Sequence, residues 1–122
     1  MYGLAYAYLG LEMFRESVRA AQEATLIDKN APQAYFVLGM AHRLVIAYDA
    51  AEKALVRAKE LDRGATPDIN WNLALLYGNN LLRYSKAADE LELFLKATPD
   101  NPDAANIRKV IANFRSKKDG VK

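Results

Sequence analysis

Apolar residues recur along this chain with the spacing of helices, and no stretch shows sustained alternation of apolar and polar residues. Residues typical of turns, among them all four prolines, interrupt the pattern at 30–32, 62–67 and 99–102. The segments between these loops are about thirty residues long, which is too long for one ordinary helix and suits two. With weaker breaks inside each segment, the pattern predicts helices over 1–10, 14–28, 32–44, 48–62, 67–80, 84–97 and 102–116.

The chain also repeats itself with a period near 34 residues. Phe14 and Tyr48 are 34 residues apart, while Leu38 and Leu73 are 35 apart and Tyr48 and Tyr84 are 36 apart. Insertions cost least in loops. The two extra residues are therefore expected in loops, one near 64–67 and one near 78–83. A period of this length is typical of helical repeat proteins.

The run from Tyr35 to His42 reads aromatic-x-x-Leu-Gly-x-x-His, and Leu4–Tyr8 and Leu73–Tyr77 are weaker copies of it. This period and motif resemble the tetratricopeptide repeat family. The second-helix element of the family is weaker here, and its closing proline survives only as Pro99. The resemblance implies an all-α, right-handed superhelical solenoid of three helix pairs plus a C-terminal capping helix. It places a single domain over 1–116, with repeats over about 1–31, 32–66 and 67–101 and the cap over about 102–116.

Residue size supports this packing. Small residues are expected where the two helices of a pair approach closely, at Ala5, Gly39 and Ala74 facing Ser17, Ala51 and Ala87. Bulky residues are expected to fill the spaces between layers, at Leu4, Tyr8, Phe14, Leu38, Tyr48, Leu73, Tyr77 and Tyr84. A stripe of Ile107, Val110, Ile111 and Phe114 is expected to close the stack, followed by a frayed basic tail over 117–122.

Composition narrows the class of protein. The chain has 122 residues, of which 52% are hydrophobic and 26% charged, a profile typical of a globular domain. A net charge of +2 favours neither nucleic acid nor an anionic membrane as partner. The basic residues near the C-terminus are expected to be a solvated helix end without nucleic-acid binding, because no aromatic residue free of packing is interleaved with them. No cysteine is present, so disulfides, thiol catalysis and thiolate metal sites are excluded.

The N-terminus begins inside a helical pattern, because no Ser, Thr, Asp or Asn precedes it to cap the helix. We therefore expect an excised piece of a longer chain, with any targeting signal upstream of Met1. Localisation stays open, with the cytoplasm as the default. The uncharged opening stretch of residues 1–11 is too short for a membrane span, which needs about 20 residues.

The residues do not suggest catalysis. His42 is the only histidine and stands where Tyr8 and Tyr77 stand in the other repeats, so a packing role is expected. Carboxylate pairs such as Asp89 with Glu92 are expected to be solvated surface. The glycines are spread over separate helices and form no phosphate-binding loop. We expect no enzyme activity, no metal site and no cofactor.

A binding surface is the remaining candidate. In the family, the first helix of each pair lines the concave face, where ligand peptides lie. By register, the partner-binding residues are Tyr2, Tyr6, Phe36, Met40, Arg43, Trp71, Asn72, Leu75 and Asn79, and the same face includes Val37 and Gly78. Helix geometry groups Phe36 with Met40 and Arg43, and Trp71 with Leu75 and Gly78. The Lys and Asn clamp of chaperone-binding members is expected to be absent, because Tyr2 and Tyr6 occupy the corresponding positions.

The sequence therefore predicts a non-enzymatic scaffold that binds an apolar or aromatic-bearing segment of another protein in its concave groove. The alternative is a structural assembly element that self-associates or stacks within a longer repeat array.

Overall fold

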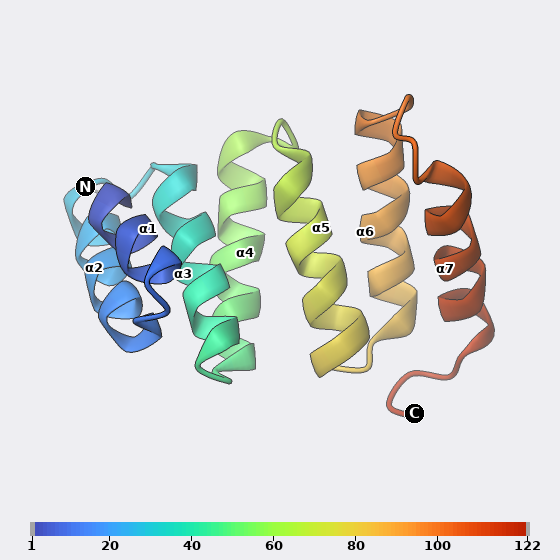
Figure 1. Cartoon of the computed structure of the whole chain (residues 1–122), viewed down its shortest axis with the longest axis horizontal. Coiled ribbons are helices and arrows are strands. Elements are labelled where there is room, and N and C mark those ends of the chain that lie inside the picture. Colours follow the sequence, from blue (N-terminus) through green and yellow to red (C-terminus); the bar gives the residue numbers. More distant parts are fainter. Residues whose placement is uncertain (1, 122) are drawn as a thin grey trace. The chain divides into compact units, whose positions relative to one another are not determined.

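The computed structural model describes residues 2–121. Within this range the chain is all-helical, with seven α-helices, one π-helical turn and no strand (Figure 1). The elements are α1 (Tyr2–Gly10), α2 (Phe14–Ile27), α3 (Pro32–Leu44), α4 (Tyr48–Asp62), α5 (Pro67–Leu75), η1 (Leu76–Asn80), α6 (Tyr84–Ala97) and α7 (Ala104–Ser116). The helices predicted from apolar spacing are confirmed, with differences at the end of α5 and the start of α7.

The chain divides into two compact units, Met1–Ala65 and Thr66–Lys122. The division falls at the predicted boundary between the second and third repeats. The single domain expected over 1–116 stays a prediction, and each unit is described by itself below.

The first unit contains α1 to α4. Helix α2 packs against both α1 and α3, and α3 pairs with α4. Close approach within each pair depends on small residues, as predicted. A Cβ atom at Gly39 would lie 2.5 Å from Cγ of Leu55, so only glycine fits at this crossing. In the first pair, the Ser17 hydroxyl donates a hydrogen bond to the carbonyl oxygen of Ala5 at 2.8 Å.

Leu4 differs from its predicted core position. Its side chain is 58% exposed, whereas Leu38, its counterpart in the second repeat, is buried. Leu38 is buried because it packs in a cluster with Ala5, Ala20 and Ala21 of the preceding helix pair. The described residues contain no pair before α1 that could cover Leu4 in the same way.

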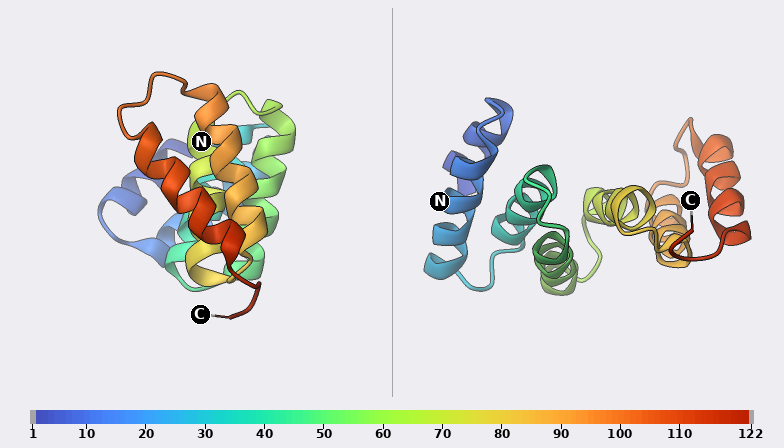
Figure 2. Two further views of the ribbon diagram at one scale, coloured as in Figure 1. Left: turned by 90° about the vertical axis from the view of Figure 1, so that its right-hand side faces the viewer. Right: turned by 90° about the horizontal axis from the view of Figure 1, so that it is seen from below.

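The second unit contains α5, η1, α6 and α7. Helix α6 packs against α5 on one side and α7 on the other, and the two outer helices flank it in Figure 2. One core cluster of this unit consists of Ala74, Leu91 and Ile107, with Phe94, Leu95, Ile111 and Phe114 packed around them. Three of the four residues of the predicted α7 stripe thus lie at this cluster. Val110, the fourth, is 44% exposed.

The extra residue expected in the loop at 78–83 lies in the helix instead. The three loops within helix pairs share one backbone feature, a left-handed residue at Glu12, Ile46 and Leu82, with φ of 60°, 67° and 53°. The loops themselves are therefore alike. What differs is the preceding turn, because Leu76–Asn80 is π-helical. A π turn holds one residue more than an α turn.

Hydrogen bonds at these loops show the same insertion. In the second repeat the N–H of Ala47 donates to the carbonyl of His42, five residues earlier, at 2.8 Å. In the third repeat the N–H of Arg83 donates to the carbonyl of Tyr77, six residues earlier, also at 2.8 Å. Tyr77 occupies the position of His42, so the insertion falls after it and shifts the end of α5.

The start of α7 and the tail differ from the sequence predictions. Helix α7 begins at Ala104, because Pro102 and Asp103 form a turn in which Oδ1 of Asn101 accepts the Asp103 N–H at 2.8 Å. The tail, predicted to be frayed, folds back on the second unit over its described part. There the N–H of Gly120 donates to the carbonyl of Leu82 at 2.7 Å. Lys122 lies outside the described residues.

Candidate functional site

An apolar hollow in the second unit brings several predicted partner-binding residues together. It is lined by α5 and η1, with α6 beneath and α7 opposite, and has a volume of about 130 Å³. We call it the α5–α7 groove. Its lining residues are Trp71, Ala74, Leu75, Asn79, Leu91, Val110 and Phe114. Trp71, Leu75 and Asn79 lie together because they recur at i, i+4 and i+8 along this end of the chain.

Gly78 forms part of the support of this groove. A Cβ atom at this position would lie 2.7 Å from Cζ of Phe114, so the absence of a side chain lets the Phe114 ring approach the π turn. The Phe114 ring also stacks against Tyr84, with ring centroids 5.7 Å apart. The register places Gly78 on the partner face, but it is buried and serves packing. Val37, placed there by the same register in the first unit, is also fully buried.

A second hollow of about 510 Å³ adjoins the groove and shares Trp71 and Val110 with it. Trp71 lines both hollows and packs against Phe94, with ring centroids 5.0 Å apart at an interplanar angle of 49°. Even so, 38% of Trp71 is exposed. An aromatic side chain that is held by packing and still open to solvent is typical of an anchor site for a partner.

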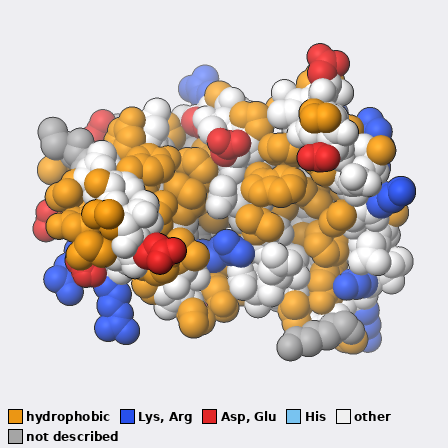
Figure 3. Space-filling model, in the orientation of Figure 1, with side chains coloured by type: hydrophobic (Ala, Val, Ile, Leu, Met, Phe, Trp, Pro, Cys, Tyr) orange, Lys and Arg blue, Asp and Glu red, His pale blue; other side chains and the backbone are white. Residues whose placement is uncertain are grey.

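The rim of the second hollow is polar and acidic. It carries two carboxylates, Asp68 in the first turn of α5 and Asp103 just before α7, together with the amides of Asn101 and Asn106. No lysine or arginine lines either hollow within the described residues. Figure 3 shows hydrophobic side chains gathered over α5 and α6, with acidic side chains near their upper edge. The electrostatic character of this surface therefore favours a cation.

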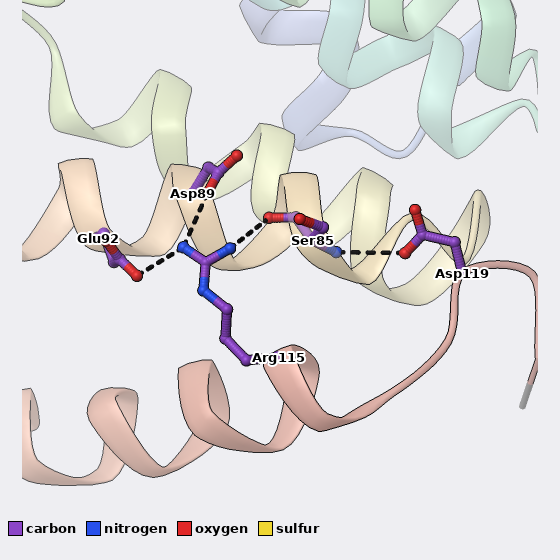
Figure 4. A network of polar contacts seen from close by, with 5 residues as sticks. All are labelled: Ser85, Asp89, Glu92, Arg115 and Asp119. Atoms are coloured by element: carbon purple, nitrogen blue, oxygen red, sulfur yellow. Dashed lines mark hydrogen bonds and ion pairs between the residues drawn. The ribbon is translucent and has the colours of Figure 1, made fainter.

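Polar contacts hold α7 in place opposite α5 (Figure 4). Arg115 Nη2 donates to Asp89 Oδ1 at 2.8 Å and to Glu92 Oε1 at 2.6 Å, and Nη1 donates to the Ser85 carbonyl at 3.3 Å. Hydrogen bonds to the two carboxylates raise the pKa of Arg115. Asp89 and Glu92, which the sequence suggests only as solvated carboxylates, thus each form an ion pair with Arg115 of α7.

The tail contributes to the same end of α6. Asp119 Oδ1 accepts the N–H of Ser85 at 3.3 Å, near the N-terminus of the helix, where a negative charge is favourable. Lys117 Nζ lies 5.0 Å from the centroid of the Tyr84 ring. The described tail therefore helps to define the position of α7.

The remaining predicted partner-binding residues have varied surroundings. In the first unit, Tyr2 and Tyr6 form an edge-on pair with centroids 5.8 Å apart and are 37% and 39% exposed. Phe36 and Arg43 are half-buried, and Met40 packs against the core of that unit. In the second unit, Asn72 does not line the groove, because its side-chain amide donates to the Asp68 carbonyl at 2.9 Å.

Sequence reasoning missed the opposite wall of the groove. The sequence assigns Val110 and Phe114 to a capping stripe and Leu91 to the second-helix element of the repeat, and it does not single out Phe94. The spacing of 110 and 114 places both on one face of α7, but which neighbour that face meets depends on the packing angle between helices.

His42 packs in the first unit. Its Nδ1 is buried and has no hydrogen-bond partner among the described residues, and burial lowers its pKa. Over the same residues, no group of three or more histidine, cysteine or acidic side chains is arranged to hold a metal ion. None of the helices described is both long and apolar enough to cross a membrane.

Comparison with known proteins reveals the fold. No family model and no curated protein matches the chain. Among solved structures, the Yersinia enterocolitica type III secretion translocator chaperone SycD matches with a TM-score of 0.81 and 14% identity, over 93% of this chain and 80% of that one. SycD in complex with a peptide of the translocator YopD gives the same score and identity, over 93% and 88%. MamA matches with a TM-score of 0.76 and 18% identity, over 98% of this chain and 76% of that one.

Both neighbours are helical repeat proteins of the tetratricopeptide type. This chain has a tetratricopeptide-like helical repeat fold. At these identities the likeness concerns the fold alone.

Proposed function

We propose that this chain belongs to the tetratricopeptide repeat family and is a non-enzymatic scaffold that binds an apolar or aromatic-bearing segment of another protein. The observation that carries the proposal is Trp71, which is held against Phe94 and yet exposed beside an apolar hollow. Three of the nine residues predicted from register line this one hollow. The complex of SycD with a translocator peptide supports the proposal, because it shows a protein of this fold holding a peptide.

The chemistry of the groove suits binding without catalysis. Its walls are aliphatic and aromatic, and Asn79 is the polar side chain among its lining residues. Burial of apolar side chains from a partner would supply most of the affinity, and the side-chain amide would fix orientation. The predicted face of the first unit, with Tyr2 and Tyr6, is proposed as a second contact surface.

Selection from a library of random peptides displayed on phage tests this proposal. The full chain should enrich peptides with apolar or aromatic anchors, and the affinity of a labelled selected peptide should then be measured by fluorescence anisotropy. Trp71→Ala should weaken binding by about 1–4 kcal/mol while the helical circular dichroism signal persists. Leu93→Ala is the matched control, because Leu93 is a similarly exposed apolar residue of α6 that does not line the groove. Equal affinities for both variants would exclude the groove as the binding site.

A structural assembly element is the second candidate. It is favoured by the exposed apolar residues of the first unit, of which Leu4, Leu11, Leu26 and Ile27 are each more than half exposed. Size-exclusion chromatography with light scattering distinguishes the candidates. A monomer at all concentrations favours the peptide-binding scaffold, and a stable dimer that Leu26→Gln disrupts favours assembly.

A further inference from the structure

We infer that the partner segment carries an arginine or lysine next to its apolar anchor, and that this cation lies over Trp71 between Asp68 and Asp103. This inference rests on the proposed function and names the chemistry of the partner. The two adjoining hollows carry it, because they differ in chemistry while sharing Trp71 and Val110.

The α5–α7 groove accepts the apolar part. At about 130 Å³ it has room for one side chain, and its lining of Leu75, Leu91 and Val110 offers a long cationic side chain no charged partner. A leucine or phenylalanine of the partner would bury its surface there. The next residue of the same segment can then reach the second hollow, since Trp71 lines both.

The second hollow accepts the cation. Asp68 and Asp103 both line it, and neither carboxylate makes an ion pair among the described residues. Trp71 adds an aromatic face, on which guanidinium and ammonium groups are attracted by the ring quadrupole. An anionic segment would meet two like charges, and a neutral segment would leave both carboxylates without a partner. Charge complementarity therefore selects a basic residue.

The strength of the expected preference for a cation follows from two interactions, an ion pair and a cation–π contact. An ion pair at a partly exposed site contributes about 0.2–1 kcal/mol, and a cation over an exposed aromatic ring about 0.5–1 kcal/mol. Together these correspond to a preference of roughly 3- to 30-fold for a cation over a neutral residue. The preference should shrink as salt rises, because the carboxylates are open to solvent.

The test uses the tightest phage-selected peptide, synthesised in three forms with Arg, Gln or Glu at the position beside its apolar anchor. Against the full chain at low salt, the Arg form should bind about 3- to 30-fold more tightly than the Gln form, and the Glu form more weakly than both. In the double variant Asp68→Asn/Asp103→Asn, the three peptides should bind with nearly equal affinity. Asp100→Asn is the matched control, because it removes one carboxylate from the neighbouring loop and does not line either hollow.

The outcomes separate the inference from the function on which it rests. Equal binding of the Arg, Gln and Glu forms, with affinity still lost in Trp71→Ala, overturns the cation site and leaves the groove in place. A preference for Arg that persists in the double variant also overturns it, since the cation would then be recognised elsewhere. Peptides whose binding ignores Trp71→Ala overturn both proposals.

Discussion

Gly78 lies against the tip of the Phe114 ring, with 2.7 Å between the position a Cβ would take and Cζ of the ring. This contact joins the π turn after α5 to α7, and it fixes how far apart the walls of the α5–α7 groove stand. The π turn, which accommodates the extra residue of the third repeat, therefore packs directly against Phe114 near the end of α7.

We predict that Gly78→Ala destabilises the second unit by about 1–3 kcal/mol, the usual cost of overpacking a well-filled core. The ring cannot move away easily, because it also stacks on Tyr84. Chemical denaturation followed by circular dichroism measures the change. In a Phe114→Leu background the same substitution should be close to neutral. Gly10→Ala, where nothing lies within 4 Å, is the control and should cost nothing.

The buried pair of Asn70 and Glu90 leads to a second prediction. Asn70 Nδ2 donates to Glu90 Oε1 at 3.0 Å, and the two residues are 4% and 8% exposed. Asn70→Leu should cost about 1–3 kcal/mol, because a buried carboxyl oxygen loses its donor. Asn70→Leu/Glu90→Ala should cost less than the sum of the single changes, since alanine occupies the equivalent positions at 20 and 54. If the destabilisation of the double variant equalled the sum of the two single changes, Asn70 and Glu90 would not be coupled.

His42 should make stability depend on pH. Burial lowers the pKa of His42 in the folded chain below its ordinary value of 6.5, so the unfolded chain binds a proton more readily. Stability from this group is therefore complete above about pH 6.5 and falls as the pH drops toward the folded-state pKa. Melting temperatures across this range should decline more steeply for the natural chain than for His42→Tyr, which carries the residue found at Tyr8 and Tyr77. If the melting temperatures of the two chains declined in parallel, His42 would not be the source of the pH dependence.

Arg115 should control how firmly α7 is held. Arg115→Gln removes the charged bonds to Asp89 and Glu92, so amides of α7 should exchange with deuterium faster. High salt should have the same effect on the natural chain, because these contacts are exposed. Arg108→Gln, on the same helix, is the control. Exchange that is unchanged in Arg115→Gln would show that apolar packing alone holds α7.

The sequence is sufficient to predict the features that depend on the spacing of residues within a helix and on the repeat period of the chain. The seven helices, the close contact at Gly39 and the pairing of Ala5 with Ser17 follow from residue size and spacing, which act locally. The neighbouring positions of Trp71 and Leu75 follow for the same reason, whereas Gly78, which the same spacing groups with them, is buried.

Other features depend on tertiary packing and were not predictable in this way. An extra residue shows in the spacing of Tyr48 and Tyr84, but spacing cannot tell a longer loop from a π turn. The position of Val110 on the groove depends on the angle at which α7 meets α6. Asp119 approaches Ser85 only because the tail folds back, and nothing in a basic terminal segment predicts that contact.

The proposal that the α5–α7 groove binds the partner is tested most directly by the indole N–H of Trp71, the single tryptophan of the chain. Its cross-peak in a nitrogen–proton correlation spectrum can be followed as the selected Arg peptide is added to the full chain. We expect this peak and the side-chain amide peaks of Asn79 to shift in proportion to bound peptide, with Leu93 and Lys96 on the other side of α6 unaffected. A saturating titration that moves the peaks of Leu93 and Lys96 and leaves the Trp71 indole in place would contradict the proposal.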